Sequence, residues 1–126
     1  MIRKFNPPGV PAPAFYSHAA EVTHPARTVY VAGQVGVRAD GSVGEGIGEQ
    51  TRVATENLKR VLAAADMDVS NVAKYTIYLT DESLFDGFVA EGAPLISSPP
   101  PPTTLVYVKA LASPAYLIEI EAVAAK

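Results

Sequence analysis

The chain has 126 residues, of which 48% are hydrophobic and 18% are charged, and it contains no cysteine. This length predicts a single domain over residues 1–126, since one domain typically takes about 100–200 residues. Ten Lys and Arg residues against thirteen Asp and Glu residues give a net charge of −3, so no basic surface for nucleic acid is expected. The lack of cysteine excludes disulfides, cysteine catalysis and zinc sites with cysteine ligands.

No targeting or membrane-spanning segment is predicted. The basic residues Arg3 and Lys4 are followed closely by Asn6-Pro7-Pro8 rather than by an apolar stretch. No window approaches the about 20 apolar residues that a membrane span needs. We therefore expect a cytoplasmic protein that does not contact a membrane.

The first half of the chain is predicted to hold three strands and one helix. Short strands are expected over residues 2–5 and 17–22, on either side of a proline-rich loop at residues 7–14. Residues 28–37 predict a stronger strand, because valines alternate there with other side chains. Between residues 47 and 65, apolar side chains recur at spacings of three and four, which predicts a helix with one apolar stripe.

The second half predicts a strand over residues 71–79, a shorter helix that Asp81 caps and that reaches about residue 91, and strands over residues 103–110 and 116–123. This order predicts an α+β fold with two helices on one face of a sheet. The other face is not clearly polar, although a solvated face of an antiparallel sheet should be. We therefore expect other subunits to cover it.

Two patterns that often carry chemistry have a plainer interpretation here. The glycine-rich segment 41–48 precedes the first predicted helix, but Glu45 and Glu49 would face a bound phosphate, so a hairpin or loop is favoured. His18 and His24 have no partner at the spacing of a metal site, and a structural role is favoured for His18.

Two carboxylates stand out in the last predicted strand. Glu119 and Glu121 lie on one face of it, because side chains alternate along a strand. Each is either solvated, held in an intersubunit ion pair, or poised for proton transfer. Gly33 and Gln34 interrupt another strand, which predicts a plain bulge at a subunit contact or a close approach by a ligand, with Gln34 anchoring a carbonyl or a water.

Several segments, in their order and spacing, resemble the RidA/YjgF family of small enamine/imine deaminases, also described as L-PSP-type endoribonucleases. The resemblance covers essentially the whole chain. Its segments are Ala14–Ala19, Tyr30–Val35, Glu49–Thr51, Asn57–Lys59, Val61–Leu62, Tyr75–Asp81, Pro101–Val106 and Ile118–Ala122.

The resemblance implies a chorismate-mutase-like α+β fold and a homotrimer with a central barrel. It also implies a small-molecule site in the cleft between neighbouring subunits, without a metal or organic cofactor. Family deaminases hydrolyse reactive enamines and imines to keto acids and ammonia. By matching position, Glu119 helps to place the attacking water, while Tyr16, Gly33 and Gln34 line the cleft.

The chain departs from the family pattern at two site positions. The family's carboxylate-binding arginine falls on Thr103, and its asparagine falls on Val89. Without a bidentate cation, a small carboxylate binds less tightly, which argues against the usual 2-imino-acid activity. Lys109, about 20 Å along the same predicted strand, is too distant to substitute, so a replacement cation has to come from a neighbouring subunit. The resemblance therefore indicates an arginine-less branch.

Two functions remain open at this point. The first is a cofactor-independent hydrolase of an imine, enamine or related small metabolite, in which Glu119 is the base, Tyr16 and Gln34 orient the substrate, and Thr103 replaces the cation. The alternative is a trimer that binds a small metabolite without catalysis. A ribonuclease is the weakest hypothesis, because no basic groove is predicted.

Overall fold

Four strands form one mixed sheet, in the spatial order β3-β6-β4-β5. The computed structural model describes every residue from 1 to 126. Strand β6 (Ile118–Ala125) lies between β3 (Thr28–Val35) and β4 (Val72–Leu79) and is antiparallel to both, while β5 (Thr103–Tyr107) pairs with β4 in parallel. The predicted order of elements is confirmed.

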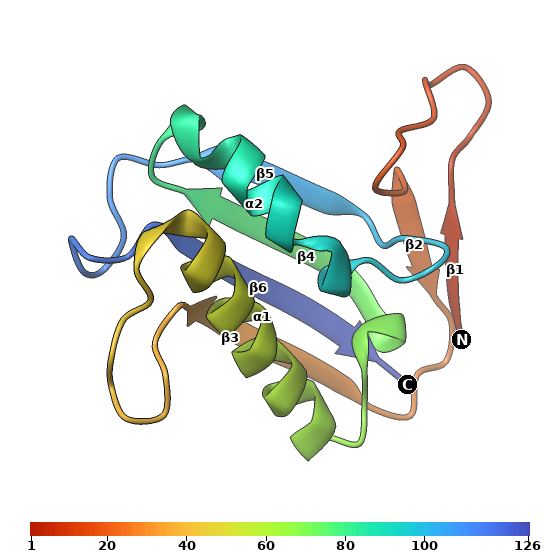
Figure 1. Ribbon diagram of the computed structural model, residues 1–126. Helices are drawn as coiled ribbons and strands as arrows, with labels where there is room; N and C mark the ends of the chain where they lie inside the picture. Colours follow the sequence, from red (N-terminus) through yellow and green to blue (C-terminus); the bar gives the residue numbers. More distant parts are fainter.

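The remaining strands, β1 (Ile2–Phe5) and β2 (Ala19–Val22), form a separate antiparallel pair. Figure 1 shows this pair beside the end of the four-stranded sheet, with the loop between the two strands extending away from it.

Both helices cover the same face of the four-stranded sheet, as predicted (Figure 1). Helix α1 (Gly46–Ala64) lies along β3 and β6, and the short α2 (Phe85–Glu91) lies over β4 and β5. Asp81 caps the turn before α2 as predicted, since its carboxylate accepts a hydrogen bond from the backbone of Ser83 at 2.8 Å. Three 3₁₀ turns complete the chain: η1 (Val69–Asn71), η2 (Glu82–Leu84) and η3 (Ala93–Leu95).

The core lies between the helices and the sheet. On α1, the predicted stripe is fully buried at Ala54, Leu58 and Leu62. On β6, burial alternates, so that Ile118 and Ile120 face the helices without any exposed surface. None of the helices is both long and apolar enough to cross a membrane.

The opposite face of the sheet is not covered by any element of the chain. Tyr30 is 80% exposed there, and Glu119, Glu121 and Val123 alternate with the buried positions of β6. We call this the open face. The homotrimer and its central barrel remain predictions.

Some strand ends differ from the prediction, and hydrogen bonds explain them. Strand β3 ends at Val35 rather than at residue 37, because the Asn57 amide of α1 donates to the carbonyls of Val35 and Val37 at 3.2 and 2.8 Å. Val37 instead bridges to Val43, which makes the glycine-rich segment start as a hairpin-like loop, as predicted.

Strand β5 ends at Tyr107 rather than at residue 110. Its neighbour β4 ends at Leu79, whose carbonyl accepts the last hydrogen bond, from the backbone of Val108 at 2.8 Å. The edge strand has no partner beyond that point. Lys109 therefore lies on an exposed loop and not on the strand face to which the sequence assigned it.

Candidate functional site

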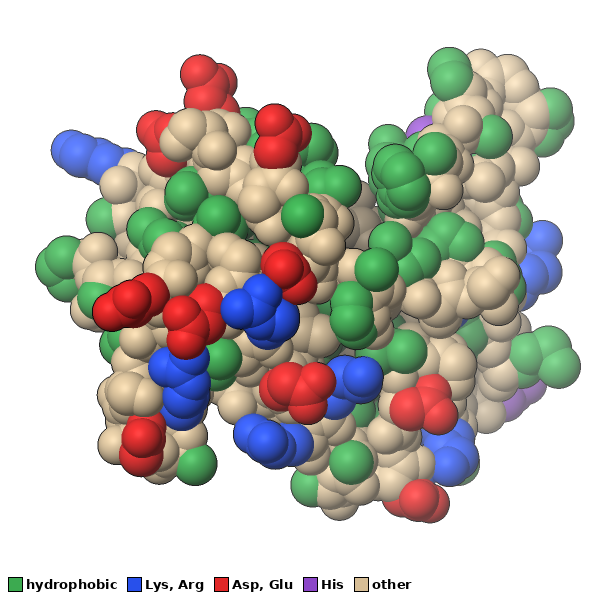
Figure 2. Space-filling view, viewed as in Figure 1, with side chains coloured by type: hydrophobic (Ala, Val, Ile, Leu, Met, Phe, Trp, Pro, Cys, Tyr) green, Lys and Arg blue, Asp and Glu red, His purple; other side chains and the backbone are tan.

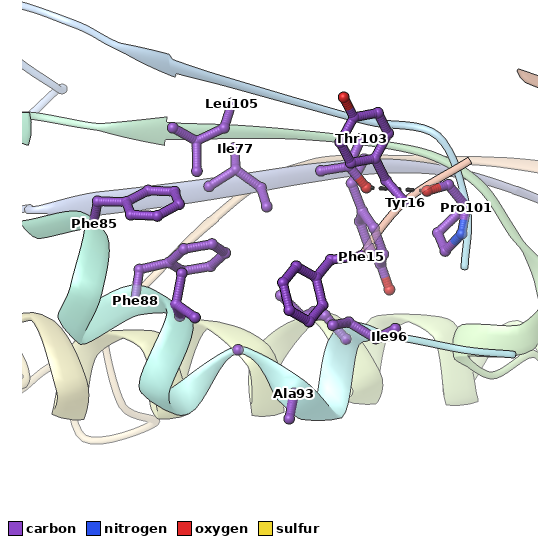
Figure 3. A pocket seen from close by; sticks show the side chains of 14 residues that line it. Phe15, Tyr16, Ile77, Phe85, Phe88, Ala93, Ile96, Pro101, Thr103 and Leu105 are labelled. Carbon is purple, nitrogen blue, oxygen red and sulfur yellow. Dashed lines mark hydrogen bonds between the residues drawn. The ribbon is translucent and has the colours of Figure 1, made fainter. Parts of the chain in front are cut away.

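A cavity of about 400 Å³ opens between α2, η3, the edge of the sheet and the N-terminal loop. Fourteen residues line it, and eleven of them are hydrophobic. Figure 3 shows Phe85 and Phe88 at one end and Phe15 and Tyr16 at the other, with Ile77 and Leu105 of the sheet between the two ends. This cavity holds two of the predicted site residues, Tyr16 and Thr103.

Ser17 fixes the N-terminal loop at the cavity. Its hydroxyl donates to the carbonyl of Pro100 at 2.6 Å, and its backbone N–H donates to Pro101 at 3.4 Å. Ser17 is itself buried. The two bonds connect the loop to the start of β5 and so place Tyr16 beside the cavity with 39% of its surface exposed.

Thr103 is the first residue of β5 and faces the same side of the sheet as its register partner Tyr75. Its hydroxyl donates to the carbonyl of Pro101 at 3.2 Å, the dashed line in Figure 3. A hydroxyl has only one proton to donate. In this conformation, Thr103 therefore has no free donor for a ligand.

Glu119 lies on the open face, against Gly33. A Cβ atom at Gly33 would meet the Cδ atom of Glu119 at 2.4 Å and its Oε2 atom at 2.8 Å. The predicted bulge is present, since the register between β3 and β6 shifts between Val31 and Gln34. Gly33 thus makes room for the Glu119 side chain, rather than for the ligand that the sequence indicated.

The two carboxylates of β6 differ in whether they have a hydrogen-bond partner within the chain. Glu121 accepts a hydrogen bond from the hydroxyl of Tyr78. This bond, followed by burial and the nearby charges of Glu121 and Glu119, raises the pKa of the Tyr78 phenol. Glu119 has neither a hydrogen bond nor an ion pair within the chain, which leaves it as the free carboxylate of this face.

Gln34 is not placed beside Glu119. Its register partner is Ile120, which faces the helices, and paired residues of an antiparallel ladder project to the same face. Its amide donates to the carbonyl of Ala32 at 3.1 Å. Gln34 therefore supports the bulge within its own strand.

The predicted site residues thus form two separate groups. Tyr16 and Thr103 belong to the cavity on the helix side, and Gly33 and Glu119 belong to the open face. By register, Thr103 lies opposite Tyr75 and Glu119 opposite Tyr78. Three residues along the strands and two strand spacings separate Thr103 from Glu119, which amounts to about 14 Å.

The remaining candidates of the sequence have structural roles or none. His18 lies on the N-terminal loop, where its ring Nε2 is 2.7 Å from the carbonyl oxygen of Pro11 and its backbone N–H donates to Asn6. No group of three His, Asp or Glu side chains is arranged to hold a metal ion.

The sequence reasoning missed Tyr75, which lines the cavity and is 2% exposed. It also missed the aromatic walls formed by Phe15, Phe85 and Phe88. The alternation of β4 does indicate that Tyr75 faces the helices. It does not indicate that the short α2 leaves a cavity there.

Comparisons with known proteins agree on the family. The model of the Endoribonuclease L-PSP family matches residues 9–126. A RutC family protein from Sulfurisphaera tokodaii is 34% identical over 113 residues, which cover 88% of this chain and 87% of that protein. A 2-iminobutanoate/2-iminopropanoate deaminase from Rattus norvegicus is 37% identical over 113 residues, covering 86% of this chain and 78% of the relative.

Solved structures show the same fold. A protein of unknown function of the conserved Rid protein family from Yersinia pestis superposes with a TM-score of 0.87 at 32% identity, covering 99% of this chain and 98% of its own. RidA from an Antarctic Psychrobacter bacterium gives a TM-score of 0.74 at 32% identity, with coverages of 91% and 94%. The chain therefore belongs to the Endoribonuclease L-PSP family, which is the RidA/YjgF family that its sequence segments resemble.

Proposed function

We propose that this chain is a hydrolase that converts a small imine or enamine to a carbonyl compound and ammonia, in clefts between the subunits of a homotrimer. Relatives named as deaminases of 2-iminobutanoate and 2-iminopropanoate support the reaction class. The observation that carries the proposal is the free carboxylate of Glu119 on a face that the chain leaves uncovered.

The division of the site into two groups supports the assembly. Within one chain, Tyr16 and Thr103 cannot reach a molecule that also touches Glu119, because they lie on opposite sides of the sheet. A second copy, with its open face against the mouth of the cavity, would bring Gly33 and Glu119 to that mouth. The cavity mouth is itself apolar and exposed, with Phe15 at 67% and Val89 at 47%, as expected of a surface that another subunit covers.

The proposed chemistry needs one group that takes a proton and returns it. Glu119 accepts a proton from water as the water oxygen adds to the imine carbon, and returns this proton to the nitrogen, which gives a carbinolamine. The same carboxylate then takes the hydroxyl proton of the carbinolamine and passes it to the amino group, so that the C–N bond breaks and ammonia leaves as the carbonyl forms. Tyr16 orients the substrate at the mouth, Gly33 allows the carboxylate its position, Gln34 holds the bulge, and Thr103 forms part of the cavity wall.

The test measures ammonia release from imines that an amine oxidase or an amino-acid oxidase generates in situ. We expect Glu119→Gln to slow the release by about 10²–10⁴-fold, because an amide cannot act as the base. The matched control is Glu121→Gln, on the same strand face, which can still accept the Tyr78 hydrogen bond and should keep nearly full activity.

Unchanged turnover in Glu119→Gln would remove the assigned base. If the wild-type chain binds small ligands but releases no ammonia above the spontaneous rate, the protein is instead the non-catalytic binding trimer. The occupied hydroxyl of Thr103 and the missing cation favour that second function over hydrolysis of imino acids.

A further inference from the structure

The cavity has no charged wall. None of its fourteen lining residues is Lys, Arg, His, Asp or Glu. Its volume of about 400 Å³ is more than twice the roughly 150 Å³ that suffices for a benzene-sized guest. The space therefore suits a molecule larger than benzene and offers nothing that would compensate a buried charge.

One polar atom of the cavity residues lacks a partner. The hydroxyl of Tyr75 is buried and makes no hydrogen bond, although the side chain belongs to the lining. Burial raises the pKa of this phenol, so it stays protonated and remains a donor. The oxygen atom has almost no surface that a water-sized molecule can reach, so the hydroxyl does not face the open part of the cavity and offers no hydrogen bond to a bound molecule.

The other groups near the cleft do not favour an anion. Thr103 already donates its proton to Pro101, and Lys109 lies on an exposed loop beyond β5. If a second copy contributes its open face, the charge it brings is the carboxylate of Glu119. Lys74, also on that face, donates to Thr104 at 2.5 Å and lies four residues, about 13 Å, along β4 from Tyr78, the register partner of Glu119.

We propose that the cavity binds an uncharged, largely apolar molecule through contacts with its aromatic and aliphatic walls. For the reaction, the inference rests on the proposed function and names its substrate. This substrate is a neutral imine or enamine that carries an aromatic or aliphatic group and no carboxylate. The apolar group fills the space between Phe15 and Phe88, and the reacting carbon lies toward the mouth.

The binding test uses two probes of nearly equal shape, phenylacetamide and phenylacetate, with affinities measured by ligand-observed NMR titration. We expect phenylacetamide to bind at least about tenfold more tightly, because the carboxylate loses its hydration without gaining a cation. The measurement needs no turnover. Equal binding of the two probes, tighter binding of phenylacetate, or binding of neither overturns the proposal.

Variants test why the carboxylate is disfavoured. The control Tyr107→Phe removes a hydroxyl from a 48% exposed tyrosine outside the cavity and should change neither affinity. Thr103→Arg should raise the affinity for phenylacetate at least about tenfold. An unchanged phenylacetate affinity in Thr103→Arg contradicts the view that the missing cation disfavours the carboxylate.

A kinetic comparison separates this inference from the proposed function. Imines formed from phenylethylamine by an amine oxidase and from phenylalanine by an amino-acid oxidase differ by one carboxylate. We expect faster ammonia release from the first. A preference for the second leaves a hydrolase but removes the neutral substrate, whereas selective phenylacetamide binding without any turnover leaves the cavity assignment and removes the hydrolase.

Discussion

The contact between Gly33 and Glu119 shows how one missing side chain positions a carboxylate. Any β-carbon at position 33 would overlap the Glu119 side chain, with the nearest separation at 2.4 Å. Only side-chain atoms of Glu119 are that close, so the strand itself need not move. The glycine therefore matters for where the carboxylate lies more than for whether the chain folds.

Gly33→Ala should accordingly lower the rate of ammonia release at least tenfold while the free energy of unfolding falls by no more than about 1 kcal/mol. The readouts are the oxidase-coupled assay and urea denaturation. A matched control is Gly48→Ala in α1, where the nearest atom is 3.6 Å from the added Cβ. It should stabilise the chain by about 0.5–1 kcal/mol and leave the rate unchanged. A large loss of stability in Gly33→Ala would contradict this view.

Individual residues were predictable from the sequence to different degrees. The shared face of Glu119 and Glu121 follows from strand periodicity, and the bulge follows from a glycine within a strand. Which of the two carboxylates is free did not follow, because it depends on Tyr78, a partner across the sheet. Tyr75 was missed for the same reason, since the lack of a hydrogen-bond partner is visible only in three dimensions.

Among the elements, α1 is tied to the segment before β6 by Gln50, in addition to the bonds of Asn57 to the end of β3. Gln50 in its first turns is 2% exposed. Its amide donates to the carbonyls of Gly44 and Ala115 at 3.0 and 2.9 Å, and its carbonyl accepts the backbone N–H of Leu117 at 2.9 Å. The bonds to Ala115 and Leu117 connect the start of the helix to the segment that leads into β6, and thereby to Glu119, while the bond to Gly44 holds the loop before the helix.

Gln50→Glu keeps the shape but turns a carboxylate oxygen toward two carbonyls. We expect it to lower the free energy of unfolding by at least about 3 kcal/mol at pH 7. The folded state raises the pKa of this new carboxyl above its unfolded value, so the protonated form folds better and the loss shrinks as the pH falls toward 4. Denaturation at both pH values, relative to wild type and to the exposed control Glu56→Gln, measures this. A pH-independent loss would contradict the assignment.

The elements themselves were largely predictable, but their ends were not. The alternation of valines located β3, and the spacing of apolar residues located α1 to within a residue or two. Strand β3 ends early because the Asn57 amide of α1 donates to the carbonyls of Val35 and Val37. Strand β5 ends early because its neighbour β4 ends at Leu79, which leaves no partner beyond Val108. Such ends depend on neighbours in space, which local periodicity does not report.

For the whole molecule, the open face explains why so small a chain is so apolar. The helices cover one face of the sheet, and the other presents Tyr30 and Val106, which are 80% and 39% exposed. Figure 2, which views the helix side, shows charged side chains over the helices and hydrophobic ones toward the N-terminal pair of strands. The charged side chains thus gather over the helices, whereas the open face exposes Tyr30 and Val106.

Tyr30→Glu should therefore dissociate the proposed trimer, because it places a charge on the apolar face at which the copies would meet. Light scattering after gel filtration should show a trimeric wild type and a smaller variant that has lost ammonia release. Lys59→Glu, an exposed change on α1, should stay trimeric and active. A wild type that is monomeric at working concentration would contradict both the assembly and the intersubunit site.

The separation of about 14 Å between Thr103 and Glu119 also affects how this protein can change. Substitutions that far apart, without shared partners, usually have additive effects. The residues proposed to select the bound molecule lie on the helix side, and the carboxylate proposed as the base lies on the open face. Selectivity can therefore be altered by successive replacements around Thr103 and Tyr75 while the reactive carboxylate and its glycine remain as they are. A single scaffold can in this way acquire new substrates without having to acquire a new reaction.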